Sequence, residues 1–176
     1  MSKTVTYIRH FKQLSHRNTD SKINTKSLPN PIPAFEYDLI LCSPYLRCRQ
    51  TAELINVRNK PIEIDSNLSE YQGHKKLKLL KLTPSTQQYE IPVLDETWEE
   101  CDERLNRHIE NVNTKNNVKI LVITHGIVVN YMQEHFIKRS CCKQQDLCDK
   151  YYHMGYKTHK RGRDVPFGKG FTVVIK

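Results

Sequence analysis

The chain has 176 residues, with 28 Lys and Arg against 19 Asp and Glu, so its formal net charge at pH 7 is +9 and favours anionic partners. This length fits one domain with one hydrophobic core, and 38% hydrophobic with 27% charged residues excludes a disordered polymer. No run approaches the roughly 20 apolar residues of a membrane span, and the polar start lacks an export signal. We therefore expect a cytoplasmic protein without membrane association.

The first part of the chain predicts two strands that each end on polar residues. Residues 3–8 predict the first strand, and the stretch rich in Pro and Asn that follows predicts a loop. Residues 38–42 predict the second strand. Ser43 is expected to cap a helix and Pro44 to be its first residue, with the helix ending near Asn56.

Beyond this helix, the pattern predicts a short strand, an insertion and a long helix. The strand is expected at residues 61–64, and residues 74–94 form a basic insertion interrupted by proline. Thr97 and Glu100 have the spacing of a capping box. Apolar residues then recur at intervals of three and four, which is typical of a helix.

The last part of the chain contains the most continuous apolar run, at residues 118–123. Such a run predicts a central strand that is covered on both faces. Residues 126–137 predict a helix that packs beneath it, residues 138–165 are polar and rich in cysteine, and residues 171–175 predict a final strand.

Residues suited to phosphate chemistry follow three of the predicted strands. Arg9 and His10 follow the first, Arg47 lies shortly after the second, and His125 follows the central strand. Because parallel sheets bind ligands outside the carboxyl ends of their strands, these side chains are expected to meet in one crevice. Arginine donors match phosphate oxygens, and Arg47 falls in a first helical turn, where free N–H groups also favour an anion.

The same residues suggest a route for phosphoryl transfer. Nearby cations lower the pKa of a histidine because they disfavour its protonated form, and a neutral imidazole can attack phosphorus. A phosphohistidine intermediate would divide one difficult transfer into two easier steps. Glu70 is the carboxyl best placed by sequence context to protonate the departing alcohol and then to activate water.

Together these motifs resemble the histidine phosphatase superfamily, also called phosphoglycerate mutase-like. Arg9-His10-Phe11 stands where the family has Arg-His-Gly after its first strand, and residues 43–53 are similar to its motif Ser-Pro-Leu-x-Arg-Ala-x-Gln-Thr-Ala-Glu. The resemblance extends discontinuously from residue 4 to about residue 137. Its remaining parts are the segment around Glu70, the pair Glu96-Thr97 with Arg104, and Thr124-His125-Gly126.

The resemblance implies an α/β fold, a three-layer α/β/α sandwich around a mostly parallel sheet, formed by residues 1–176 with a divergent C-terminal segment at 138–176. It implies a phosphoric monoester hydrolase with His10 as nucleophile and Glu70 as general acid and base. Arg9, Arg47 and His125 would hold the phosphate, with His125 completing the catalytic set. No metal or organic cofactor is implied.

The chain departs from the family pattern at two places near the nucleophile. Phe11 replaces the motif glycine, so its ring must point away from the phosphate or reshape the pocket. The family often has an asparagine six residues after the histidine, where this chain has His16, with Asn18 as a loose substitute. We include His16 and Asn18 as candidate substrate-binding residues.

Two other functions remain open at this stage. A mutase would return the phosphoryl group to another hydroxyl of the same substrate, and a catalytically silent module would only bind a phosphorylated partner. The substrate would be a phosphorylated small molecule or a phosphoprotein, with its specificity in residues 11–35, 74–94 and 138–168. Neither the substrate nor the oligomeric state follows from the sequence.

Three further clusters have more than one interpretation. Lys75, Lys76, Lys78 and Lys81 form either a solvated helix face or a contact to a second phosphate or an acidic peptide. The basic stretch at 157–163 is either a plain surface segment or a site that binds polyanions. Because it lacks interleaved aromatic residues, nucleic acid is not expected as a partner. A zinc site is disfavoured because a Cys-x-x-Cys pair is missing. Its ligand types occur at Cys141, Cys142, Cys148, His153 and His159.

Overall fold

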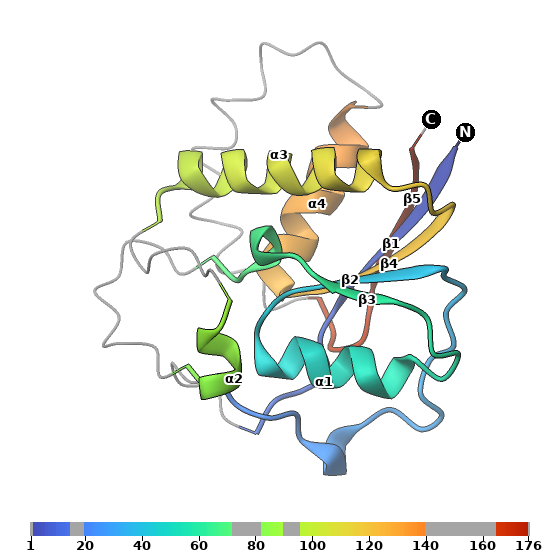
Figure 1. Cartoon of the computed structure of the whole chain (residues 1–176), viewed down its shortest axis with the longest axis vertical. Helices are drawn as coiled ribbons and strands as arrows, with labels where there is room; N and C mark the ends of the chain where they lie inside the picture. Colours follow the sequence, from blue (N-terminus) through green and yellow to red (C-terminus); the bar gives the residue numbers. More distant parts are fainter. Residues whose placement is uncertain (1, 15–19, 72–81, 90–95, 140–164, 176) are drawn as a thin grey trace.

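The computed structural model describes residues 2–14, 20–71, 82–89, 96–139 and 165–175 (Figure 1). Their strands form a five-stranded sheet in the order β3-β2-β4-β1-β5. The β1, β2, β3 and β4 pairings are parallel, whereas β5 runs antiparallel to β1. The strands are β1 (Lys3–Arg9), β2 (Leu39–Cys42), β3 (Ile62–Ile64), β4 (Lys119–Thr124) and β5 (Gly170–Ile175).

Helices cover both faces of this sheet (Figure 1). Helix α1 (Leu46–Ile55) lies on one face, and helices α3 (Trp98–Thr114) and α4 (Gly126–Arg139) lie on the other. Because side chains alternate along a strand, Ile40 of β2 packs in the core under α1, while Leu39 and Leu41 pack in the core with α3 and α4. The expected three-layer α/β/α sandwich around a mostly parallel sheet is confirmed.

Strand β4 lies between β1 and β2, and its residues 120–124 are all buried. This confirms the central strand that the apolar run at 118–123 predicted. The register pairs Arg9 with Thr124 and Cys42 with Ile123, so the three strands end at nearly the same level. His10 and His125, which directly follow β1 and β4, therefore lie side by side.

The predicted capping box is present at the start of α3. Thr97 Oγ1 accepts a hydrogen bond from the Glu100 N–H at 3.1 Å, and the Glu100 carboxylate accepts one from the Thr97 N–H at 2.7 Å. Helix α4 extends two residues beyond its predicted end and finishes at Arg139. The insertion contains a short helix, α2 (Pro84–Gln87), with the proline in its first turn.

The predicted start of α1 is wrong by two residues. Ser43 lies before the helix and does not cap it: its N–H donates to the Ile123 carbonyl at 3.0 Å and continues the ladder between β2 and β4, and its hydroxyl lies 2.8 Å from His125 Nε2. The N-cap residue is Tyr45, and the helix begins at Leu46. Two 3-10 turns complete the described elements, η1 (Thr25–Ser27) and η2 (Ser66–Leu68). Within the described ranges, no helix combines the length and the apolar character needed to cross a membrane.

Candidate active site

Four of the predicted site residues meet at the carboxyl ends of β1, β2 and β4. Arg47 lies at their centre, in the first turn of α1, and its side chain is 4% exposed. Its Nε donates to His10 Nε2 at 3.2 Å, and its Nη2 donates to Glu70 Oε2 at 2.5 Å and to His125 Nδ1 at 3.1 Å. The structure therefore brings together two imidazoles, a guanidinium and a carboxylate from segments far apart in the chain.

The contacts of His10 define which of its ring nitrogens carries the proton. Nδ1 lies 2.7 Å from the Phe11 carbonyl, which can only accept, and Nε2 faces the Arg47 Nε–H, which can only donate. The neutral imidazole with its proton on Nδ1 satisfies both contacts. Its Nε2 lone pair then points toward Arg47.

His125 is fully buried beside these groups. Burial lowers the pKa of His125 well below its usual value, and the positive charge of Arg47 acts in the same direction. Since Nδ1 accepts from Arg47, the proton of the neutral ring lies on Nε2, which is 2.8 Å from Ser43 Oγ. The hydroxyl that the sequence suggested as a helix cap thus orients the second histidine of the site.

Arg9 lies at the edge of the same cluster. Its Nη1 donates to the Val165 carbonyl at 2.7 Å, and its guanidinium carbon lies 3.9 Å from the centre of the Phe167 ring. Its Nε is buried and has no hydrogen-bond partner among the described residues. Burial lowers the pKa of Arg9, an effect that Glu70 opposes and Arg47 reinforces. Arg9 thus retains a donor for an anion.

Asp20 is a site residue that sequence reasoning missed. Its side chain is fully buried, its Oδ1 accepts from the Leu46 N–H at 2.7 Å, and the same oxygen lies 3.8 Å from Arg47 Nη1. Its Oδ2 accepts from Thr83 Oγ1 at 3.0 Å and from Thr86 Oγ1. The N-terminus of α1, expected to attract a bound anion, is therefore capped by a carboxylate of the protein itself.

Phe11 points into the core and not toward the clustered histidines and arginine. It is 1% exposed and packs with Ile8 and Cys48 under α1, while its N–H donates to Thr51 Oγ1 at 3.0 Å. Gly168 makes room for the ring, since a Cβ at that position would lie 2.7 Å from Phe11 Cε1. Gly168, near the C-terminus, thus leaves space for Phe11, the residue that replaces the motif glycine.

Four sets of candidate residues fall outside the described residues. They are His16 with Asn18, the lysine cluster at 75–81, the cysteine and histidine residues considered for zinc, and the basic stretch at 157–163. Within the part of the chain that the structure describes, no group of three or more His, Cys, Asp and Glu side chains could hold a metal ion. Phe167, which contacts both Arg9 and His10, was also missed, because it lies in the segment where the sequence offered no motif.

The family model of the histidine phosphatase superfamily (branch 1) matches residues 18–147, and the chain belongs to this superfamily. The match begins after Arg9 and His10, so the position of these two residues at the end of β1 comes from the structure. No curated protein matches the chain significantly in sequence.

Several solved structures share the fold at low sequence identity. A structure described as an alpha-ribazole-5'-P phosphatase from Escherichia coli K-12 is 19% identical, with a TM-score of 0.55 over 73% of this chain and 76% of that chain. The alpha-ribazole phosphatase of Shigella flexneri is 19% identical, with a TM-score of 0.52 over 72% and 75%. A structure described as phosphohistidine phosphatase SixA from Nakamurella multipartitia is 13% identical, with a TM-score of 0.52 over 99% and 85%.

Proposed function

We propose that the protein is a metal-independent phosphatase that hydrolyses phosphate monoesters through a phosphohistidine intermediate on His10. The observation that carries this proposal is the pair of contacts that His10 makes: Nδ1 lies 2.7 Å from the Phe11 carbonyl, and Nε2 lies 3.2 Å from Arg47 Nε. Together they favour the tautomer with a lone pair on Nε2. Membership of the histidine phosphatase superfamily supports an activity of the phosphatase or mutase type. The positive charge of Arg47 and Arg9 would stabilise the transferring phosphoryl group.

The reaction divides into two displacements. In the first, His10 Nε2 attacks phosphorus, the ester P–O bond breaks, and the carboxylic acid form of Glu70 gives its proton to the leaving alkoxide. In the second, the Glu70 carboxylate takes a proton from water, whose oxygen attacks phosphorus while the P–N bond breaks. Inorganic phosphate leaves, and both His10 and the protonated Glu70 are regenerated.

The position of Glu70 suits this double role. Its Oε2 lies 2.5 Å from Arg47 Nη2 and 3.6 Å from His125 Nδ1, and its side chain is 31% exposed. The carboxyl is thus close to the phosphate-binding guanidinium and still reached by water.

Turnover of 4-nitrophenyl phosphate tests the proposal directly. We expect His10→Ala to abolish turnover and a matched change at a histidine on α4, His135→Asn, to retain it. Rapid acid-free quenching with radiolabelled substrate should trap a phosphoenzyme that is labile to acid and stable to base, as a phosphoramidate is. Activity that depended on added divalent metal, or that survived His10→Ala, would overturn the proposal.

The mutase and the silent module are tested in the same series. A mutase converts one phosphoglycerate isomer into the other faster than it releases phosphate, whereas the proposed phosphatase releases phosphate. A silent module binds inorganic phosphate without turnover of any monoester. A panel of sugar phosphates, inositol phosphates, nucleotides and phosphopeptides, assayed with wild type and His10→Ala, would then define the substrate class.

A further inference from the structure

The loop that leads to Glu70 is fastened through the backbone carbonyls of residues 67–69. Thr124 Oγ1, at the end of β4, donates to the Leu68 carbonyl at 2.7 Å. Arg104 Nη1, on α3, donates to the Asn67 carbonyl and, at 3.0 Å, to the Ser69 carbonyl. Three consecutive peptide groups directly before Glu70 are therefore held by elements outside the loop.

Arg104 is 3% exposed, and its hydrogen bonds all go to the protein. Its Nε and Nη2 form a bidentate pair with the Glu96 carboxylate at 2.6 and 2.7 Å. The second N–H of Nη2 faces Cys101 Sγ at 3.6 Å, and Nη1 uses both of its N–H groups on the loop. Because every N–H of this guanidinium has an acceptor, Arg104 differs from Arg9 and keeps no donor for a substrate.

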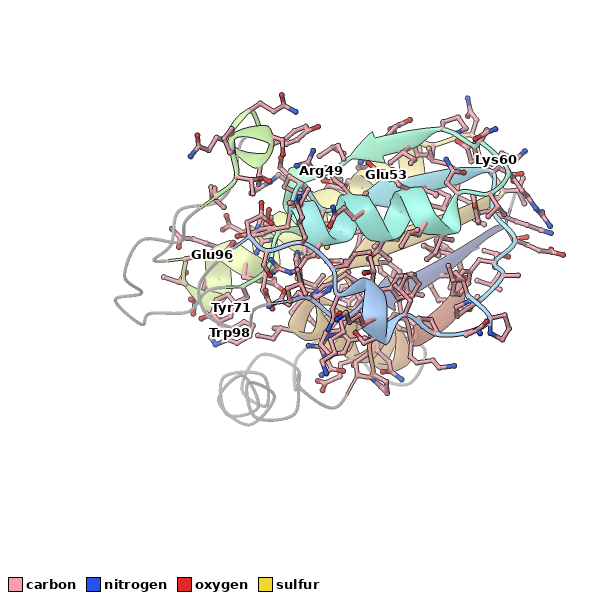
Figure 2. All side chains as sticks on the ribbon, turned by 90° about the horizontal axis from the view of Figure 1, so that it is seen from below. Arg49, Glu53, Lys60, Tyr71, Glu96 and Trp98 are labelled. Carbon is pink, nitrogen blue, oxygen red and sulfur yellow. The ribbon has the colours of Figure 1, made fainter. Side chains whose placement is uncertain are left out.

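The residue after Glu70 is held by the same end of α3. Tyr71 is 5% exposed and stacks on Trp98, the first residue of α3, with 3.8 Å between the ring centroids. Figure 2 shows Tyr71, Trp98 and Glu96 close together at one end of the molecule. The N-terminal half of α3 thus holds the chain on both sides of Glu70.

We propose that Arg104, braced by Glu96, is a positioning residue that determines where the Glu70 carboxyl lies relative to the leaving group. This inference rests on the proposed role of Glu70 as general acid. Proton transfer needs the acid within hydrogen-bond reach of the departing oxygen, and a misplacement of about 1 Å can cost about 10²-fold in rate. A lysine at position 104 would keep the charge but could not hold Glu96 bidentately and both carbonyls at once.

The test compares two substrates that need the acid to different degrees. A 4-nitrophenolate leaves without protonation, whereas the alkoxide of glycerol 2-phosphate requires it. The measured quantity is kcat/KM, because it reports the phosphorylation of His10 and excludes the later hydrolysis of the phosphoenzyme. For Arg104→Lys we expect kcat/KM on glycerol 2-phosphate to fall roughly 10- to 100-fold and that on 4-nitrophenyl phosphate to fall less than about 3-fold.

Thr97→Ala provides the matched control. It removes the capping hydrogen bond at the same end of α3 and leaves the contacts between Arg104 and the loop in place. We expect it to lower the Tm without changing the ratio of kcat/KM between the two substrates. If Arg104→Lys does not fold, Glu96→Gln weakens the brace of the same guanidinium and is judged by the same ratio.

Glu70→Gln separates failure of this inference from failure of the proposed function. It should show the same selective loss on glycerol 2-phosphate, and adding Arg104→Lys in that background should not change the ratio further. If Glu70→Gln spares glycerol 2-phosphate, the acid role itself is wrong. If Glu70→Gln is selective but Arg104→Lys slows both substrates equally, Arg104 is structural only and the positioning role is refuted.

Discussion

The contact between Glu70 and Arg47 leads to a prediction in which binding and catalysis change in opposite directions. Glu70 Oε2 lies 2.5 Å from Arg47 Nη2, so the carboxylate occupies a donor that a phosphate dianion would use. Glu70→Gln keeps the size of the side chain and removes its charge. We expect the variant to bind inorganic phosphate more tightly than the wild type while it turns over glycerol 2-phosphate more slowly.

The size of the effect follows from the surroundings of the pair. A hydrogen bond to a charged group contributes about 1.5–3 kcal/mol when buried and an exposed ion pair about 0.2–1 kcal/mol. Since the Glu70 side chain is 31% exposed and that of Arg47 is 4% exposed, an intermediate value of about 1.5 kcal/mol applies. This corresponds to roughly tenfold tighter phosphate binding. Loss of the proposed general acid should lower turnover by roughly 10² to 10⁴-fold.

Competitive inhibition of 4-nitrophenyl phosphate turnover by inorganic phosphate measures the binding change, and calorimetric titration measures it independently of turnover. Glu53→Gln is the control, because Glu53 is an exposed carboxylate on α1 and its removal changes the net charge equally (Figure 2). Unchanged or weaker phosphate binding by Glu70→Gln would show that the carboxylate does not compete for Arg47. A tightening of equal size in Glu53→Gln would assign the effect to net charge alone.

Buried groups around the site respond to other changes in measurable ways. Phe11→Ala should lower the free energy of unfolding by about 3–5 kcal/mol. Gly168→Ala should lower it less in the Phe11→Ala background than in the wild type, because the added methyl group no longer meets the ring. Equal losses of unfolding free energy in the two backgrounds, measured by denaturant unfolding, would contradict this packing. Since burial and then Arg47 lower the pKa of His125, its ring-proton NMR signals should not titrate between about pH 5.5 and 8, and a midpoint near its usual value would refute the neutral ring. Burial alone would raise the pKa of Asp65, but hydrogen bonds that include one from His108 lower it to about 2. As the pH falls, the unfolded chain therefore takes up a proton at this carboxylate before the folded protein does. The free energy of unfolding should fall between about pH 4 and 2 more steeply in wild type than in Asp65→Asn. Parallel pH curves for the two proteins would contradict the role of that carboxylate.

The elements that place the site could be predicted from the sequence because they depend on local patterns. The apolar run at 118–123 is typical of a strand covered on both faces, and β4 occupies that place between β1 and β2. Once three parallel strands end level, the residues after them must lie together. The meeting of His10, Arg47 and His125 is therefore a consequence of topology that spacing along the chain was enough to anticipate.

The contacts that refine the site could not be predicted, because each joins segments with no common local signal. Asp20 lies in a loop, and nothing in its neighbours indicates that its carboxylate caps a helix that begins at Leu46. Ser43 has the residue type of an N-cap, but the β2–β4 ladder takes its N–H and the hydroxyl turns to His125. Local propensity favoured the cap, and tertiary pairing prevailed over it.

Arg47 has two carboxylate neighbours, and burial decides which of them can yield to a substrate. Asp20 is fully buried and accepts hydrogen bonds from the backbone of α1 and from α2, so moving it would leave several donors without a partner. Glu70 is 31% exposed, and its hydrogen bond to Arg47 can be replaced by one to water when phosphate arrives. In the proposed mechanism, Asp20 therefore keeps the Arg47 guanidinium oriented, while Glu70 is the carboxylate that would leave Arg47 to the phosphate and act as the acid.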